Sequence, residues 1–185
     1  MKRVTLAAGL PLALFLSSCG DHLGEYQLQD VRLVRQIPED ALDGRDAPSS
    51  SEYLRVELSS ETSLYAANTG AGLYTDADFC PLRDPHRLIA FGPIASDGKA
   101  VEDYKREEEL RPEGDGRYHY FVYLALSSPA RKLFSNSDDV IAEYDLRQQR
   151  RDVCVRFFVP GYNITPSRST TVAIPASTLL AAPTI

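Results

Sequence analysis

Residues that can bind a metal ion gather in one short stretch of the sequence. Cys80, Asp84 and His86 lie within seven residues and offer sulfur, oxygen and nitrogen donors, the types that zinc takes. A zinc site needs several protein ligands held in one geometry, and this cluster alone leaves such a site incomplete. We therefore expect no metal site, and we expect His86 to lie in a surface loop.

Asp76 and Asp78 have the spacing of two oxygen ligands in a calcium-binding loop. That motif also needs a glycine and a bidentate acid at fixed later positions, and this sequence has neither. The two aspartates are therefore expected in a turn, with their carboxylates in water.

Serine catalysis needs a histidine and an acid beside the serine. No Gly-x-Ser-x-Gly elbow occurs, and the histidines available as bases are His22, His86 and His119. A glycosidase pair is equally unassignable, because any two of the 26 acidic residues could meet in space. No phosphate-binding glycine loop or dinucleotide fingerprint is present. The sequence therefore names no catalytic residue and no cofactor.

Aromatic residues are frequent around one strong strand pattern and could form a platform for a sugar or a peptide. Sandwich cores and cross-strand pairs use the same side chains, so core packing is the expected role. The residues concerned are Tyr65, Tyr74, Phe79, Tyr118, Tyr120, Phe121 and Tyr123.

The N-terminal residues have the three parts of an export signal. Lys2 and Arg3 are basic, residues 4–15 form an almost unbroken apolar run too short to span a membrane, and small residues follow. The ending Leu16-Ser17-Ser18-Cys19 resembles the lipobox of bacterial lipoproteins. The resemblance implies that residues 1–18 are cleaved off and that Cys19 is lipidated on sulfur. An ordinary signal peptide cut near Ser18 or Gly20, or an uncleaved anchor, is the alternative.

Lipidation would leave residues 19–24 as the modified N-terminus and a short tether, with a domain at residues 25–185. Each buried CH₂ contributes about 0.8 kcal/mol, so more than one acyl chain gives a stable anchor without a membrane-spanning helix. Gly20 stands where an aspartate favours inner-membrane retention in enterobacteria. The expected location is therefore the bacterial cell envelope, at the outer membrane and facing the periplasm.

Lipidation of Cys19 would also determine which cysteines can form a disulfide. The chain has three cysteines, and modification of Cys19 leaves Cys80 and Cys154 as the single possible intramolecular pair in an oxidising compartment. The separation of the two cysteines fits a bridge between the two sheets of a sandwich, tying the halves of the domain together. Two buried free thiols, or a bond between chains, are the alternatives.

The mature chain would be acidic. Removing 18 of the 185 residues leaves 167, and the loss of Lys2 and Arg3 changes the formal charge from −6 to −8. An acidic exported domain is a poor match for nucleic acid, whose phosphates need a basic surface. Arg147, Arg150 and Arg151 form a local basic cluster, expected in a solvated turn or edge strand; contact with anionic lipid or cell wall is the alternative.

Short alternating segments separated by glycine, proline and aspartate make up most of the remaining chain. Residues 26–37 predict a strand with one bulge, and residues 117–126 predict a central strand because both of its faces are mostly apolar. Residues 99–110 fit either a short helix or a charged edge strand, and residues 129–134 fit one helical turn. Further strands are expected at 53–59, 64–67, 72–74, 87–91, 140–146, 152–159 and 170–174.

This pattern predicts a mainly β protein: a single β-sandwich of roughly seven to nine short strands with at most one or two short helices. The plan resembles immunoglobulin-like or transthyretin-like sandwiches. Tryptophan is absent, however, and Asp152 stands where a true immunoglobulin domain has a tyrosine two residues before the second cysteine. The resemblance is therefore to β-sandwich envelope lipoproteins as a broad group, at the level of fold alone.

From the anchor and the missing catalytic motif we expect a membrane-anchored envelope lipoprotein that acts as an interaction or structural component, not an enzyme. Its expected partners are the membrane, through Cys19, and a protein of the envelope. An envelope hydrolase and a glycan- or peptide-binding module remain alternatives. A cleft holding His86 or His119 beside a serine and an acid would favour the hydrolase, whereas an exposed strand edge or apolar patch would favour protein contact.

Overall fold

The computed structural model of the chain describes residues 22–42, 52–67, 72–83, 87–132, 138, 140–160 and 166–183. Its strands are β1 (Gln27–Val34), β2 (Tyr53–Ser60), β3 (Tyr74–Phe79), β4 (Ala90–Ala95), β5 (Tyr118–Ala125), β6 (Ser127–Ser128), β7 (Arg131–Lys132), β8 (Val140–Ile141), β9 (Tyr144–Asp145), β10 (Val153–Val159), β11 (Ser167–Arg168) and β12 (Val172–Ile174). Its helices are α1 (Glu39–Leu42), α2 (Leu146–Gln149) and α3 (Ala176–Ala181), with 3-10 turns η1 (Leu64–Ala67), η2 (Val101–Asp103) and η3 (Glu107–Glu109).

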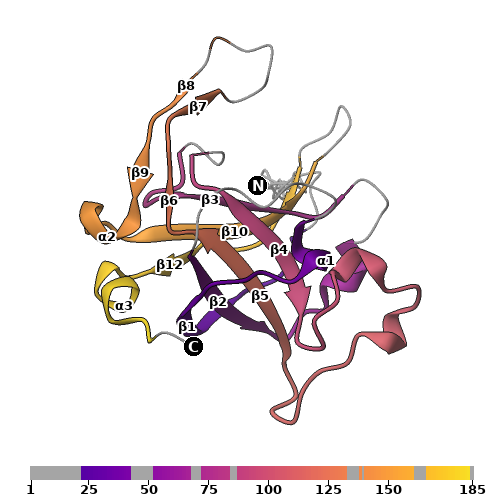
Figure 1. The fold of residues 1–185 in the computed structure, drawn as a ribbon. Coiled ribbons are helices and arrows are strands. Elements are labelled where there is room, and N and C mark those ends of the chain that lie inside the picture. Colours follow the sequence, from indigo (N-terminus) through magenta and orange to yellow (C-terminus); the bar gives the residue numbers. More distant parts are fainter. Residues whose placement is uncertain are drawn as a thin grey trace, which may run out of the picture.

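Two antiparallel sheets form the body of the molecule. The first has the order β1-β2-β5-β4, and in the second β10 pairs with β3 along one edge and with β11 and β12 along the other. The pairs β6–β9 and β7–β8 form a ribbon that projects from the body (Figure 1). The predicted mainly β sandwich is therefore confirmed. In the part of the chain that the structure describes, seven strands exceed two residues, while the three short α-helices exceed the one or two expected.

The main core lies between the two sheets. Along β5 the residues Tyr120, Val122 and Leu124 are fully buried, while the alternate residues face the other way. Val155 and Phe157 of β10 bring the second sheet against this layer. This packing follows from the two-residue repeat of a strand, which places every second side chain on the same face.

A second apolar cluster covers the opposite face of the first sheet. Tyr53 and Tyr123 pack there with Phe91 and Ile94, and Ala41 of α1 lies over them. β5 is therefore buried on both faces along most of its length, which confirms the central position predicted from its apolar pattern.

The segment before β1 joins the two sheets. The backbone of His22 bridges to Arg168, and the N–H of Leu23 donates to the Arg168 carbonyl at 3.0 Å. The ring of Tyr26 lies edge-on to Phe157 of the second sheet, with centroids 4.9 Å apart, and 6.1 Å from Tyr120 of the first. The chain then enters β1 and pairs with β2, so residues 22–26 close one side of the sandwich.

Gly24 allows the chain to cross from the second sheet to the first. Its φ of +97° lies in the left-handed region, and a Cβ there would meet the side chain of Thr62 at 2.7 Å. The expected tether at residues 19–24 thus has its last three residues packed into the fold.

Several segments differ from their sequence expectations. Residues 64–67 form a 3-10 turn instead of a strand, and 131–132 belong to a β ladder where one helical turn was expected. β1 has its predicted bulge, between Leu28 and Asp30. α3 was not predicted from the sequence. No helix of the described part of the chain is long and apolar enough to cross a membrane.

Candidate functional site

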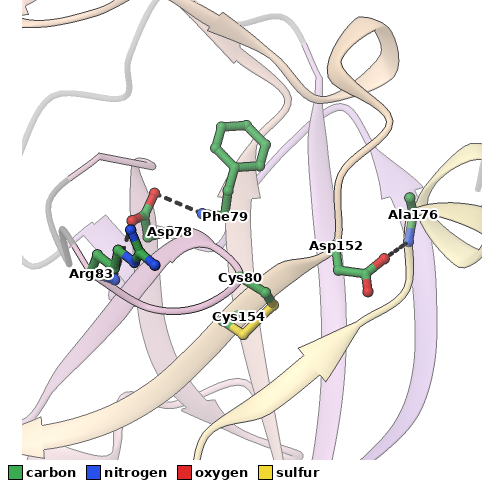
Figure 2. Close-up of a disulfide and its surroundings, with 7 residues drawn as sticks. All are labelled: Asp78, Phe79, Cys80, Arg83, Asp152, Cys154 and Ala176. Atoms are coloured by element: carbon green, nitrogen blue, oxygen red, sulfur yellow. Dashed lines mark hydrogen bonds between the residues drawn. A yellow bond between two sulfur atoms is a disulfide. The ribbon is translucent and has the colours of Figure 1, made fainter.

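Cys80 and Cys154 lie at disulfide distance, with their Sγ atoms 2.17 Å and their Cα atoms 5.0 Å apart (Figure 2). Cys80 directly follows β3 and Cys154 lies in β10, the neighbouring strand. The N–H of Cys80 also donates to the Asp152 carbonyl at 2.9 Å. The bond therefore joins adjacent strands of one sheet. The expected bridge between sheets was wrong, because the strand before Cys80 pairs with the strand that contains Cys154.

Asp76 and Asp78 are buried on β3, at 3% and 4% exposure, and not solvated in a turn as expected. Asp76 Oδ2 accepts hydrogen bonds from Arg156 Nε at 2.9 Å and Nη2 at 2.8 Å, across the β3–β10 ladder. Asp78 accepts from the backbone N–H of Phe79 at 2.7 Å, as Figure 2 shows. A buried carboxylate is tolerated when hydrogen bonds or an ion pair replace its contacts with water. Both aspartates therefore have a structural role.

The candidate metal ligands do not meet in the described residues, where no group of three or more His, Cys, Asp or Glu side chains is placed to hold a metal ion. Cys80 lies in the disulfide. Asp84, His86 and the lipidation candidate Cys19 lie outside the described residues.

His119 lies between two carboxylates on the outer face of the first sheet. Its Nδ1 is 2.8 Å from Glu57 Oε1 on β2, and its Nε2 is 3.0 Å from Asp115 Oδ2 in the preceding turn. Ser59 is opposite His119 in the ladder, but its hydroxyl accepts hydrogen bonds from Gln29 and Arg117. Both ring nitrogens of His119 contact carboxylates, so His119 links β2 to the turn. Neither nitrogen is placed to act as a base on Ser59.

The charge of His119 depends on these neighbours. Its side chain is 10% exposed, and this burial alone would lower the pKa of the imidazole. The hydrogen bonds to Glu57 and Asp115, with the charge of Glu113 nearby, outweigh burial and raise the pKa above its ordinary value. Hydrogen bonding to His119 correspondingly helps to lower the pKa of Asp115, after the larger effect of the Arg117 N–H.

Most of the aromatic residues are packing residues, as expected. Tyr120 and Phe79 belong to the main core, and Tyr123 to the second cluster. Tyr74 is the exception: it is 41% exposed and stacks on Phe158 with ring centroids 5.5 Å apart.

The outer edge of β1 faces a groove of about 510 Å³, here called the β1–α3 groove. It is lined by Leu28, Gln29, Asp30 and Val31 on β1 and by Ser177, Thr178, Ala181, Ala182 and Pro183 on and after α3. At one end the N–H of Leu33 donates to the Pro183 carbonyl at 2.8 Å. Among the described residues, no other backbone group pairs with this edge of β1.

The wall opposite β1 is held in place from the second sheet. The Asp152 carboxylate accepts from the Ala176 N–H at 2.9 Å where α3 begins (Figure 2), and Leu179 is buried in the main core. The groove therefore has two fixed walls: an edge strand of the first sheet and a helix fixed to the second.

Two other hollows differ in chemistry from this groove. One of about 60 Å³ lies between the start of β3 and the Gly92-Pro93 segment. Another, of about 410 Å³, lies beside β6, β9 and α2, where Asp145 accepts hydrogen bonds from Arg147 and Gln148. Neither places a histidine in its lining.

The chain matches no protein-family model, and neither the curated proteins nor the solved structures include one that is significantly similar to it. The function must therefore be argued from the residues and their arrangement.

Loss of the disulfide should destabilise the fold. We expect the Cys80→Ala/Cys154→Ala variant to lose roughly 2–5 kcal/mol of unfolding free energy, because the bond closes a loop across a separation of 74 residues. Urea unfolding of the exported domain, with and without reductant, measures this. Reductant should affect the wild type and leave the double variant unchanged. Alkylation of both cysteines in unreduced protein would contradict the pairing.

Replacing His119 should change how stability depends on pH. Because the folded pKa is raised, the stabilisation is fully present below the ordinary value of about 6.5 and is lost as pH rises through the folded pKa. The stability gap between wild type and His119→Gln should therefore be wider at pH 5.5 than at pH 8.5, as measured by denaturant unfolding. Glu57→Gln removes one of the carboxylates that raise the pKa of His119, so in that background the stability gap should change less between pH 5.5 and pH 8.5. If the free energies of unfolding of wild type and His119→Gln run parallel across pH, the interpretation is refuted.

Proposed function

We propose that this chain is a lipid-anchored protein of the bacterial cell envelope whose β domain binds a protein partner through the β1–α3 groove. The observation that carries the proposal is the unpaired edge of β1 beside that groove. Exposed strand edges are templates for pairing with another chain, and proteins that leave one open commonly use it for recognition.

The backbone at this edge can receive an added strand. The N–H of Leu33 points away from β2 to Pro183, and strand alternation points the N–H and C=O of Val31 in the same direction, into the groove. The bulge between Leu28 and Asp30 interrupts the regular alternation further along, so the outward-facing groups of Val31 are the ones that strand geometry fixes for pairing. Backbone hydrogen bonds would supply affinity there, and side-chain contacts with α3 would supply selectivity.

The walls of the groove indicate the kind of partner. Ser177, Thr178 and Ala181 are small and uncharged, and the carboxylate of Asp30 pairs with Arg32. A partner strand therefore meets little net charge, so an extended segment with small or apolar side chains fits better than a strongly charged one. A glycan would leave the aligned backbone groups of β1 less well paired.

The N-terminal residues support the proposed location in the cell envelope. The basic start, the apolar run and the lipobox-like Leu16-Ser17-Ser18-Cys19 support export and lipidation, and Gly20 supports the outer membrane. The disulfide-forming cysteine pair suits an oxidising compartment outside the cytoplasm.

The anchor is tested by Cys19→Ser, with Ser18→Ala as a matched control that keeps a small residue before the cysteine. Without the sulfur no acyl chain can be attached, so Cys19→Ser should remain unprocessed or leave its normal membrane fraction. Mass spectrometry should find lipid on the wild type and on Ser18→Ala. If Cys19→Ser fractionates and migrates like the wild type, the lipoprotein assignment fails.

The groove is tested by photocrosslinking in intact cells, with benzoylphenylalanine at Ala181 in the groove and at Ala173, an exposed residue of β12 outside it. We expect a discrete adduct from position 181 alone. Arginine adds a charge to a groove that carries little net charge, so Ala181→Arg should abolish an adduct formed from a probe at Ser177, whereas Ala173→Arg should not. Equal adducts from both probe positions, or an adduct unaffected by Ala181→Arg, would count against the groove.

A further inference from the structure

The folded domain begins very close to the proposed lipid. Only residues 20 and 21 separate Cys19 from His22, whose backbone already bridges to Arg168. Three residue steps of fully extended chain reach about 11 Å. Whatever conformation these residues take, His22 lies within about that distance of the lipidated residue, and Arg168 lies one strand spacing of about 4.8 Å from His22.

A row of side chains runs across the sheet from this point. Arg168 of β11 is directly opposite Phe158 of β10, and Phe158 is directly opposite Tyr74 of β3. Residues directly opposite in antiparallel strands point to the same face. That face is the outer one, because Phe157 and Val159, on either side of Phe158, belong to the main core. Strand spacing of about 4.8 Å places Tyr74 about 10 Å from Arg168.

The chemistry of this row fits a membrane interface. Tyr74 is one of three exposed large apolar side chains in the described residues, and its ring stacks on Phe158. Arg168 is exposed and makes no ion pair among the described residues, whereas Arg156 on the same face is neutralised by Asp76. Tyrosine rings favour the headgroup level of a bilayer, phenylalanine can add apolar contact there, and arginine favours anionic headgroups.

We propose that Tyr74, Phe158 and Arg168 form a membrane-contact surface that lays the outer face of the second sheet on the lipid headgroups. This proposal rests on lipidation of Cys19, since the anchor is what brings the surface to the bilayer. The three side chains are not part of the β1–α3 groove, so membrane contact and partner binding use different surfaces.

The sequence contains no tryptophan, so a single introduced tryptophan reports its own surroundings. We would reconstitute lipidated Tyr74→Trp protein into vesicles of phosphatidylethanolamine and phosphatidylglycerol that carry headgroup-proximal spin-labelled lipid. The controls are Leu180→Trp and Val140→Trp, whose positions are 51% and 64% exposed, more than Tyr74. Quenching by the labelled lipid should be several-fold stronger at position 74 than at either control, and Phe158→Trp gives a second reporter on the same surface.

Arg168→Gln tests the charge at this surface. It should weaken the quenching of the tryptophan at position 74 in phosphatidylglycerol vesicles and have little effect in vesicles without anionic lipid. Equal quenching at positions 74, 140 and 180 in protein shown by mass spectrometry to be lipidated would overturn the membrane-contact proposal and leave the anchor intact. Protection of position 74 from aqueous iodide without lipid quenching would also overturn it, and would indicate contact with protein. Lack of lipid on Cys19 would instead refute the proposed function.

Discussion

The attachment of residues 22–26 to both sheets is the constraint on which the rest of the structure depends. Their backbone pairs with the segment around Arg168, while the ring of Tyr26 packs between Tyr120 and Phe157. After the crossing the chain forms β1, an edge strand of the first sheet that lines the groove beside α3. The crossing also fixes the point at which the chain leaves the domain towards Cys19.

The outer face of the second sheet shows how a strand with two acids is kept in place. β3 carries Asp76 and Asp78, residues that disfavour strands, and its contacts with β10 compensate for them. Tyr74 stacks on Phe158, Arg156 binds Asp76 through two nitrogens, and the disulfide follows at the end of the ladder. Removing one partner of such a buried ion pair is costly, because the other charge remains buried.

The two proposed surfaces place the anchor and the partner on different parts of the domain. Membrane contact uses side chains of the second sheet close to residue 22, whereas strand addition uses backbone groups of β1 in the first sheet. If Cys19 is lipidated as we propose, the short connection holds the domain at the membrane surface with little reach. A partner would then have to come to the membrane surface, or be anchored there itself.

The sequence by itself determined the mainly β class, the bulged β1 and the central β5, because two-residue alternation and turn residues are local signals. Cysteine counting, joined to the lipobox resemblance, also predicted which cysteines meet. Tertiary structure alone decided that Asp76 is buried, since its partner Arg156 lies 80 residues away. It likewise placed the disulfide within one sheet and α3 beside β1, because pairing between distant strands leaves no mark in local sequence.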